Sequence, residues 1–186
     1  MIRSQSRAGW FGASDTARIM GNWETKTFAS WWAEKLGLIE HRFKTPAMLA
    51  GTNYEHRILD AIGVKQMDRQ IKRRWYRLRV NLDGEDRTRV YEVKTYGADE
   101  FKVTKAYWQQ VQVEMFATGK NCVIVAYRLL PEDYDNYFNE IAPGRLSFHP
   151  ISYDSDFINN HYLPRLKALA KALRRKEKPV WPLHAA

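Results

Sequence analysis

The stretch NLDGEDRTRVYEVKTY, residues 81–96, decides how this chain can fold. An apolar run leads into Asp83. The turn that follows is predicted by Gly84 and its polar neighbours, and the next run predicts a second strand. Residues two apart on a strand share a face, so Glu92 and Lys94 point to the same side. The turn allows Asp83 to approach Glu92. We therefore expect two acids and one base to gather at one point of a β-hairpin.

Two carboxylates directed at one point repel each other unless a cation lies between them. A hard divalent ion such as Mg²⁺ or Mn²⁺ suits Asp83 and Glu92, because such ions take oxygen ligands and keep positions open for water and phosphate. Lys94 beside them could orient an attacking water or offset charge on a phosphate. This is the equipment of metal-dependent phosphodiester hydrolysis. An isolated Glu–Lys pair on a strand can also be an ordinary surface ion pair, so the pattern alone leaves both interpretations open.

Length and composition predict one globular domain over residues 1–186, since the chain is long enough to bury a core and 45% of it is hydrophobic. No apolar run approaches the roughly 20 residues of a membrane helix, and the first residues carry no apolar signal region. The single cysteine, Cys122, rules out an internal disulfide and a cysteine-rich zinc site. These features predict a cytoplasmic protein without a membrane partner.

The charge balance favours a polyanionic partner. The chain has 30 Lys and Arg against 21 Asp and Glu, a formal net charge of +9. Nucleic acid is the commonest partner of such chains, although a solvated basic surface has the same composition. There is no glycine-rich phosphate loop, so we expect no use of ATP.

The order of elements predicts an α/β (α+β) fold, with a central mixed β-sheet flanked by helices. Caps and glycine stops predict the helices, and β-branched runs predict the strands. The helices are expected over 12–21 (capped by Ser14), 27–38 (capped by Thr27), 45–63 (capped by Thr45), 104–120 (capped by Thr104) and, as a basic C-terminal helix, about 155–178. The strands are expected over 70–82, 88–95, 121–130 and 145–153.

Asp83 with Glu92-Val93-Lys94 resembles the restriction-endonuclease-like core of the PD-(D/E)XK nucleases, although Leu82 stands where that motif has a proline. The surrounding segments are similar to those of lambda exonuclease or YqaJ-type viral recombinase nucleases and occur in the same order. They are WFGASD (10–15), Gly51 to Glu55, Gln110-Val111-Gln112 and Met115 to Thr118. The resemblance covers about residues 7–128, the expected catalytic core, and is loose after Pro131.

The resemblance implies an active site. Asp83, Glu92 and the backbone carbonyl of Val93 would bind metal, with two Mg²⁺ ions (or Mn²⁺) per site. Glu55 would help to hold a metal or its water, and Lys94 would be the catalytic lysine. Each also has an ordinary alternative as a solvated surface residue.

Helical residues two positions apart face different sides, so only one of Gln110 and Gln112 is expected to reach the site. The resemblance favours Gln110. Arg7 and Ser14 resemble an arginine and serine that bind the 5′-phosphate of a DNA end. A capping serine at a helix N-terminus and a guanidinium are both suited to an anion. Plain capping is the alternative. His56 has no partner at metal-ligand spacing and is expected to be isolated.

The implied function is a Mg²⁺-dependent deoxyribonuclease, a 5′→3′ exonuclease that acts on double-stranded DNA ends. Its 3′ single-stranded overhang would feed a single-strand annealing protein in phage-type recombination. Members of the family form ring-shaped trimers, which implies a homotrimer here. An endonuclease with the same core, restriction-like or junction-resolving, is the first alternative. A non-catalytic DNA-binding module is the second.

Overall fold

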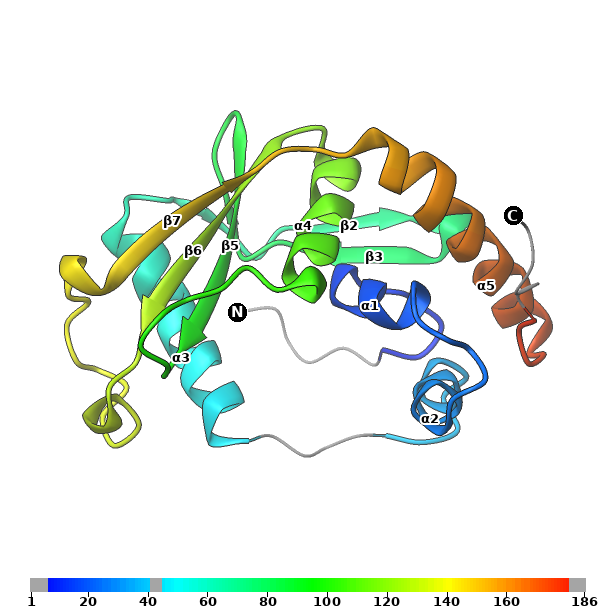
Figure 1. Ribbon diagram of the computed structural model, residues 1–186, viewed down its shortest axis with the longest axis horizontal. Coiled ribbons are helices and arrows are strands. Elements are labelled where there is room, and N and C mark those ends of the chain that lie inside the picture. The colour runs from blue at the N-terminus through cyan, green and yellow to red at the C-terminus, as the bar shows by residue number, and fades with distance from the viewer. Residues whose placement is uncertain (1–6, 41–44, 181–186) are drawn as a thin grey trace.

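The structure is a computed structural model that describes residues 7–40 and 45–180. Its centre is a five-stranded sheet with the order β1-β4-β5-β6-β7, in which β5 and β6 are parallel and the other neighbours antiparallel. Helices flank this mixed sheet, which confirms the predicted fold class (Figure 1). The strands are β1 (Gln66–Met67), β4 (Gly84–Glu85), β5 (Arg89–Tyr96), β6 (Asn121–Arg128) and β7 (Leu146–Ile151).

Two helices pack against opposite faces of the sheet. The helix α3 (Pro46–Ala61) shares a buried cluster with Val93 and Val125, which alternate with the sheet residues that face α4 (Lys105–Thr118). As predicted, Thr45 and Thr104 cap these helices through their side-chain oxygens. The helix α4 connects β5 to the parallel strand β6, as a parallel pair requires.

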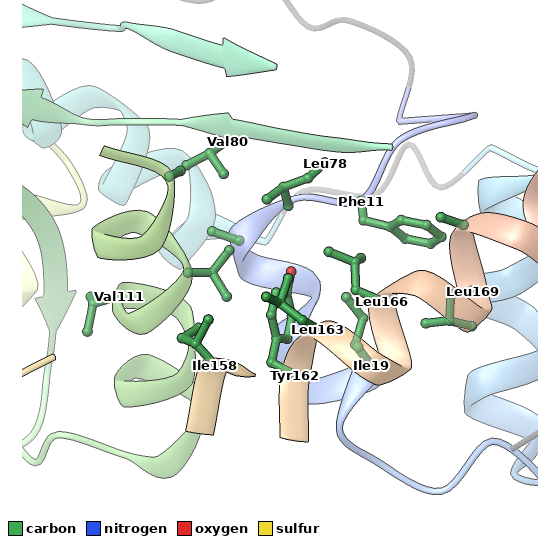
Figure 2. Close-up of a cluster of buried hydrophobic side chains, with 14 of the residues drawn as sticks. Phe11, Ile19, Leu78, Val80, Val111, Ile158, Tyr162, Leu163, Leu166 and Leu169 are labelled. Atoms are coloured by element: carbon green, nitrogen blue, oxygen red, sulfur yellow. The ribbon is translucent and has the colours of Figure 1, made fainter. Parts of the chain in front are cut away.

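A second group of elements lies beside the sheet. A two-stranded hairpin packs with the N-terminal helices and the last helix around a core that includes Phe11, Leu78, Val80 and Leu166 (Figure 2). The elements are a 3-10 turn (Ala13–Asp15), α1 (Thr16–Ile19), α2 (Lys26–Lys35), β2 (Gln70–Arg73), β3 (Leu78–Asn81), a π-helical turn (Phe157–Tyr162) and α5 (Leu163–Arg175). Within the described ranges, no helix has both the length and the apolar character needed to cross a membrane.

The predicted strand over 70–82 is wrong, because the chain reverses at Arg74–Tyr76 and forms the β2–β3 hairpin. The reason lies in the parity of the apolar residues. Ile71 is at an odd position and Leu78 and Val80 are at even ones, so one continuous strand could not direct all three to the core. The chain reversal brings them to the same side.

Two predicted helix starts are also wrong. The helix expected over 12–21 is only the 3-10 turn and the four residues of α1. The cap of α2 is Thr25, whose side chain accepts a hydrogen bond from the Phe28 backbone, and not Thr27. Gly37 does follow the end of this helix with a positive φ of 74°.

Candidate active site

The sheet brings the acids and the base of the opening stretch together. On β5, Lys94 Nζ lies 2.6 Å from Glu92 Oε1, and Glu92 is buried. Asp83 immediately precedes β4, and its Oδ2 accepts a hydrogen bond of 2.9 Å from the backbone N–H of Val93. Gly84 lets α3 pack closely on β4 next to Asp83, because a side chain at this position would lie 2.7 Å from Leu59 of α3.

Gln110 of α4 completes this cluster. Its Nε2 donates to Glu92 Oε1 at 2.6 Å, and its Oε1 accepts from Lys94 Nζ at 3.2 Å. Gln112 points elsewhere, since its amide bonds to the backbone of Ser152 and Asp154 at 2.8 and 2.7 Å. The structure thus places Gln110, and not Gln112, against the acids and the lysine.

Glu114 is a buried acid at the site, and it was not among the site residues predicted from the sequence. It lies on α4 and is fully buried, and its Oε1 accepts a hydrogen bond of 2.9 Å from Gln110 Nε2. The spacing from Gln110 could have predicted Glu114, because residues four positions apart share one face of a helix.

The cluster gathers more acidic side chains than Lys94 can pair with. Burial, followed by the charge of Glu92, raises the pKa of both Asp83 and Glu114 well above the ordinary range. Burial alone would lower the pKa of Lys94, but the carboxylates of Glu92 and Asp83 outweigh it and raise that pKa. Among the described residues, Glu92 Oε2 and Glu114 Oε2 are buried without a hydrogen-bond partner. Such orphaned carboxylate oxygens suit a divalent cation.

Glu55 lies on α3, which approaches β5 closely because Gly51 faces Thr95. Burial, followed by the charge of Glu92, raises the pKa of Glu55 to about 7. The ligand atoms of Glu55, His56 and Asp68 all lie within 4.8 Å of one another. His56 Nε2 is 3.0 Å from Asp68 Oδ2, so the expectation that His56 is isolated is wrong.

A cavity of about 90 Å³ adjoins the cluster and is lined by both residues predicted to bind a 5′-phosphate, Arg7 and Ser14. Arg79 and Gln110 also line it, so Gln110 belongs to the cavity and to the acid–lysine cluster. Burial, followed by the positive charge of Arg7, lowers the pKa of Arg79. Two guanidinium groups that destabilise each other around one small cavity favour an anion between them.

The predicted capping role of Ser14 is wrong. Gly12 occupies the cap position, and its N–H is bound by Asp15 Oδ2 at 2.7 Å, while Ser14 makes no capping hydrogen bond. The four residues of α1 are too few for a helix dipole to hold an anion. Asp15 is instead buried against Lys35 and Trp31, at 2.6 and 2.8 Å. The phosphate interpretation therefore depends on the cations that line the cavity.

The mixed sheet places Asp83 immediately before β4 and holds Glu92 and Lys94 on the neighbouring strand β5. Two solved structures share this fold. The alkaline exonuclease LHK-Exo from Laribacter hongkongensis is 22% identical, with a TM-score of 0.61 over 91% of this chain and 94% of that one. A phage-related exonuclease from Haemophilus somnus is 16% identical, with a TM-score of 0.65 over 90% of this chain and 96% of that one. A search of curated proteins found no match.

Residues 4–121 match the YqaJ-like viral recombinase domain. The match covers more than half of the 186 residues, so the chain belongs to this family.

Proposed function

We propose that this protein is a Mg²⁺-dependent exonuclease that digests the 5′-terminated strand of double-stranded DNA ends. The observation that carries the proposal is the small cationic cavity that shares Gln110 with the Glu92–Lys94 cluster. A group bound in the cavity would lie beside the hydrolytic residues, as an enzyme that removes terminal nucleotides requires. Membership of the family and the net charge of +9 also support a DNA substrate.

The acids would form the metal site. Asp83, Glu92 and the carbonyl of Val93 would bind Mg²⁺, with Glu55 completing a site for two ions. Bound metal would supply positive charge to the scissile phosphate and lower the pKa of a water. Mn²⁺ also accepts such oxygen ligands and could replace Mg²⁺.

The protein's own groups would orient the reactants. Lys94 would aim the attacking water, and the carboxylate of Glu92 and the amide of Gln110 would hold its ammonium in place. Because the Nε2 of Gln110 donates to Glu92 and Glu114, its oxygen faces the lysine.

Arg7 and Ser14 would bind the terminal 5′-phosphate. Removal of one nucleotide leaves a new 5′-phosphate, so a pocket for this group would keep the strand in register for the next cut. The remaining 3′ single strand would be available to a single-strand annealing protein, and a homotrimer around the DNA would retain the substrate between cuts.

The test compares linear duplexes that differ only in a 5′-phosphate or 5′-hydroxyl, with Mg²⁺ and with EDTA. We expect faster digestion of the phosphorylated duplex and no digestion in EDTA. Arg7→Ala should remove most of the preference, since a charge-assisted hydrogen bond contributes roughly 1.5–3 kcal/mol, about ten- to a hundredfold. Arg87→Ala, on an exposed turn, is the matched control and should retain it.

Asp83→Asn should lower cleavage by orders of magnitude and retain duplex binding, because most affinity comes from basic contacts to phosphates. Covalently closed circles should remain intact. Cutting of closed circles, or wild-type indifference to the end group, would instead support an endonuclease.

A further inference from the structure

The turn of the β2–β3 hairpin presents a large aromatic side chain to solvent. Trp75, in the 3-10 turn Arg74–Tyr76, is 78% exposed. Its neighbour Tyr76 packs against the core instead. Aromatic side chains contribute most when they stack or are buried, so an indole at the tip of a turn is free to contact a planar partner.

Basic residues flank this turn in the sequence and approach it from α5. Arg174 of α5 donates to the backbone carbonyl of Trp75 at 3.2 Å, which brings the basic end of α5 beside the turn (Figure 1). The side chains of Arg74, Arg77 and Lys171 form no hydrogen bond or ion pair within residues 7–40 and 45–180. These three positive charges thus remain available to an anionic partner.

The outer face of the hairpin continues the positive surface toward the cavity. Leu78 and Val80 direct their side chains to the core, as Figure 2 shows, so Arg79 lies on the opposite face. Lys72 pairs with Arg79 across the hairpin, and its Nζ lies 5.8 Å from the ring centre of Trp10. Both Trp10 and Arg79 line the cavity.

The outer face of the hairpin, from the turn to the cavity, has the length of a few nucleotides. At about 3.3 Å per residue, Arg77 and Asn81 are about 13 Å apart, close to about four steps of a DNA strand at about 3.4 Å each. Asn81 also lines the cavity. Cations therefore extend from Trp75 at the exposed turn to Trp10 at the cavity.

We infer that this hairpin surface, formed by Lys72, Arg74, Trp75 and Arg77 with the basic end of α5 beside it, binds single-stranded DNA, the strand that remains when its complement is digested. A basic groove with aromatic side chains suits single strands because their unpaired bases expose a face on which a ring can stack. In a duplex that face is covered by the neighbouring base pairs. The inference rests on the proposed function, since digestion supplies the strand.

The experiment measures binding of a fluorescein-labelled single strand of about 20 nucleotides in EDTA, where no cleavage occurs, by fluorescence anisotropy. Trp75→Ala should weaken this binding about tenfold and weaken binding of a blunt duplex of the same sequence much less. Arg74→Glu combined with Arg77→Glu should weaken it further and lower its salt dependence. The matched control is Phe138→Ala, an 86% exposed aromatic in the segment between β6 and β7, which should bind as the wild type does.

Trp75→Ala should digest a 5′-phosphorylated duplex at the wild-type initial rate, because the indole lies outside the hydrolytic cluster. Equal losses of affinity for single strand and duplex in Trp75→Ala would overturn the inference in favour of a general duplex contact. Unchanged affinity would show that the hairpin surface is only exposed to solvent and binds no DNA. A change of oligomeric state in light scattering would overturn it in favour of an interface between copies. A wild-type protein that binds the single strand through Trp75 but digests no DNA would refute the proposed function alone.

Discussion

Glu55 makes the repulsion among the clustered acids measurable. Burial, followed by the charge of Glu92, raises the pKa of Glu55 from 4.5 to about 7. Between these values the folded protein holds a proton that the unfolded chain has released, so stability falls as pH rises through this window. At about 1.4 kcal/mol per pH unit the loss is at most about 3.4 kcal/mol. Screening by solvent around the partly exposed carboxyl lowers our expectation to about 2 kcal/mol.

Glu55→Gln should remove this part of the pH dependence, because the amide stays neutral. Urea unfolding in EDTA should show the variant within about 0.5 kcal/mol of wild type near pH 4.5, and about 2 kcal/mol more stable near pH 8. Glu100→Gln, whose wild-type carboxylate is 76% exposed, is the control and should shift neither value. The same gain at both pH values, or a loss near pH 8, would refute the reasoning.

Three further outcomes are expected. Lys94→Ala should lower cleavage by orders of magnitude but retain Mg²⁺ binding in calorimetry. An active variant would show that Lys94 only forms an ion pair with Glu92. Glu114→Gln should retain cleavage, because it still offers Gln110 an acceptor, whereas Glu114→Leu should lower kcat about tenfold; equal rates would show that Glu114 does not orient Gln110. Gly84→Ala should cost about 1–3 kcal/mol in urea unfolding, since its methyl group would lie 2.7 Å from Leu59, and unchanged stability would mean that α3 shifts freely.

The convergence of Asp83, Glu92 and Lys94 could be predicted because local rules determine it. Strand alternation fixes which side chains share a face, and the turn before β5 fixes their approach. The register of β4 and β5, with Gly84 opposite Tyr91, has the geometry that these rules imply.

Contacts that depend on separate elements could not be predicted in the same way. Glu114 has the sequence appearance of an ordinary helical acid, and its burial results from the packing of α4. His56 meets Asp68 at a point where the chain has a φ of 59°, a conformation that is uncommon for a residue other than glycine and that the sequence did not indicate. The hairpin turn at Arg74–Tyr76 was missed for a different reason, since its parity change was visible in the sequence but its residues are not typical of turns.

The segment from β4 to α4 joins Asp83, Glu92, Lys94 and Gln110 within fewer than 30 consecutive residues, whereas Arg7 and Ser14 come from the beginning of the chain. In the proposed function, the hydrolytic residues and the two candidate phosphate ligands would thus be encoded in separate stretches of the gene, with Gln110 common to the cavity and the acid–lysine cluster. Exchange of residues 7–35 with the corresponding stretch of another family member should change the preference for an end group without transferring it whole, because Arg79 and Gln110 also line the cavity and would be retained. If the proposed function holds, such a division would allow relatives to differ in the DNA termini they accept while they share one reaction.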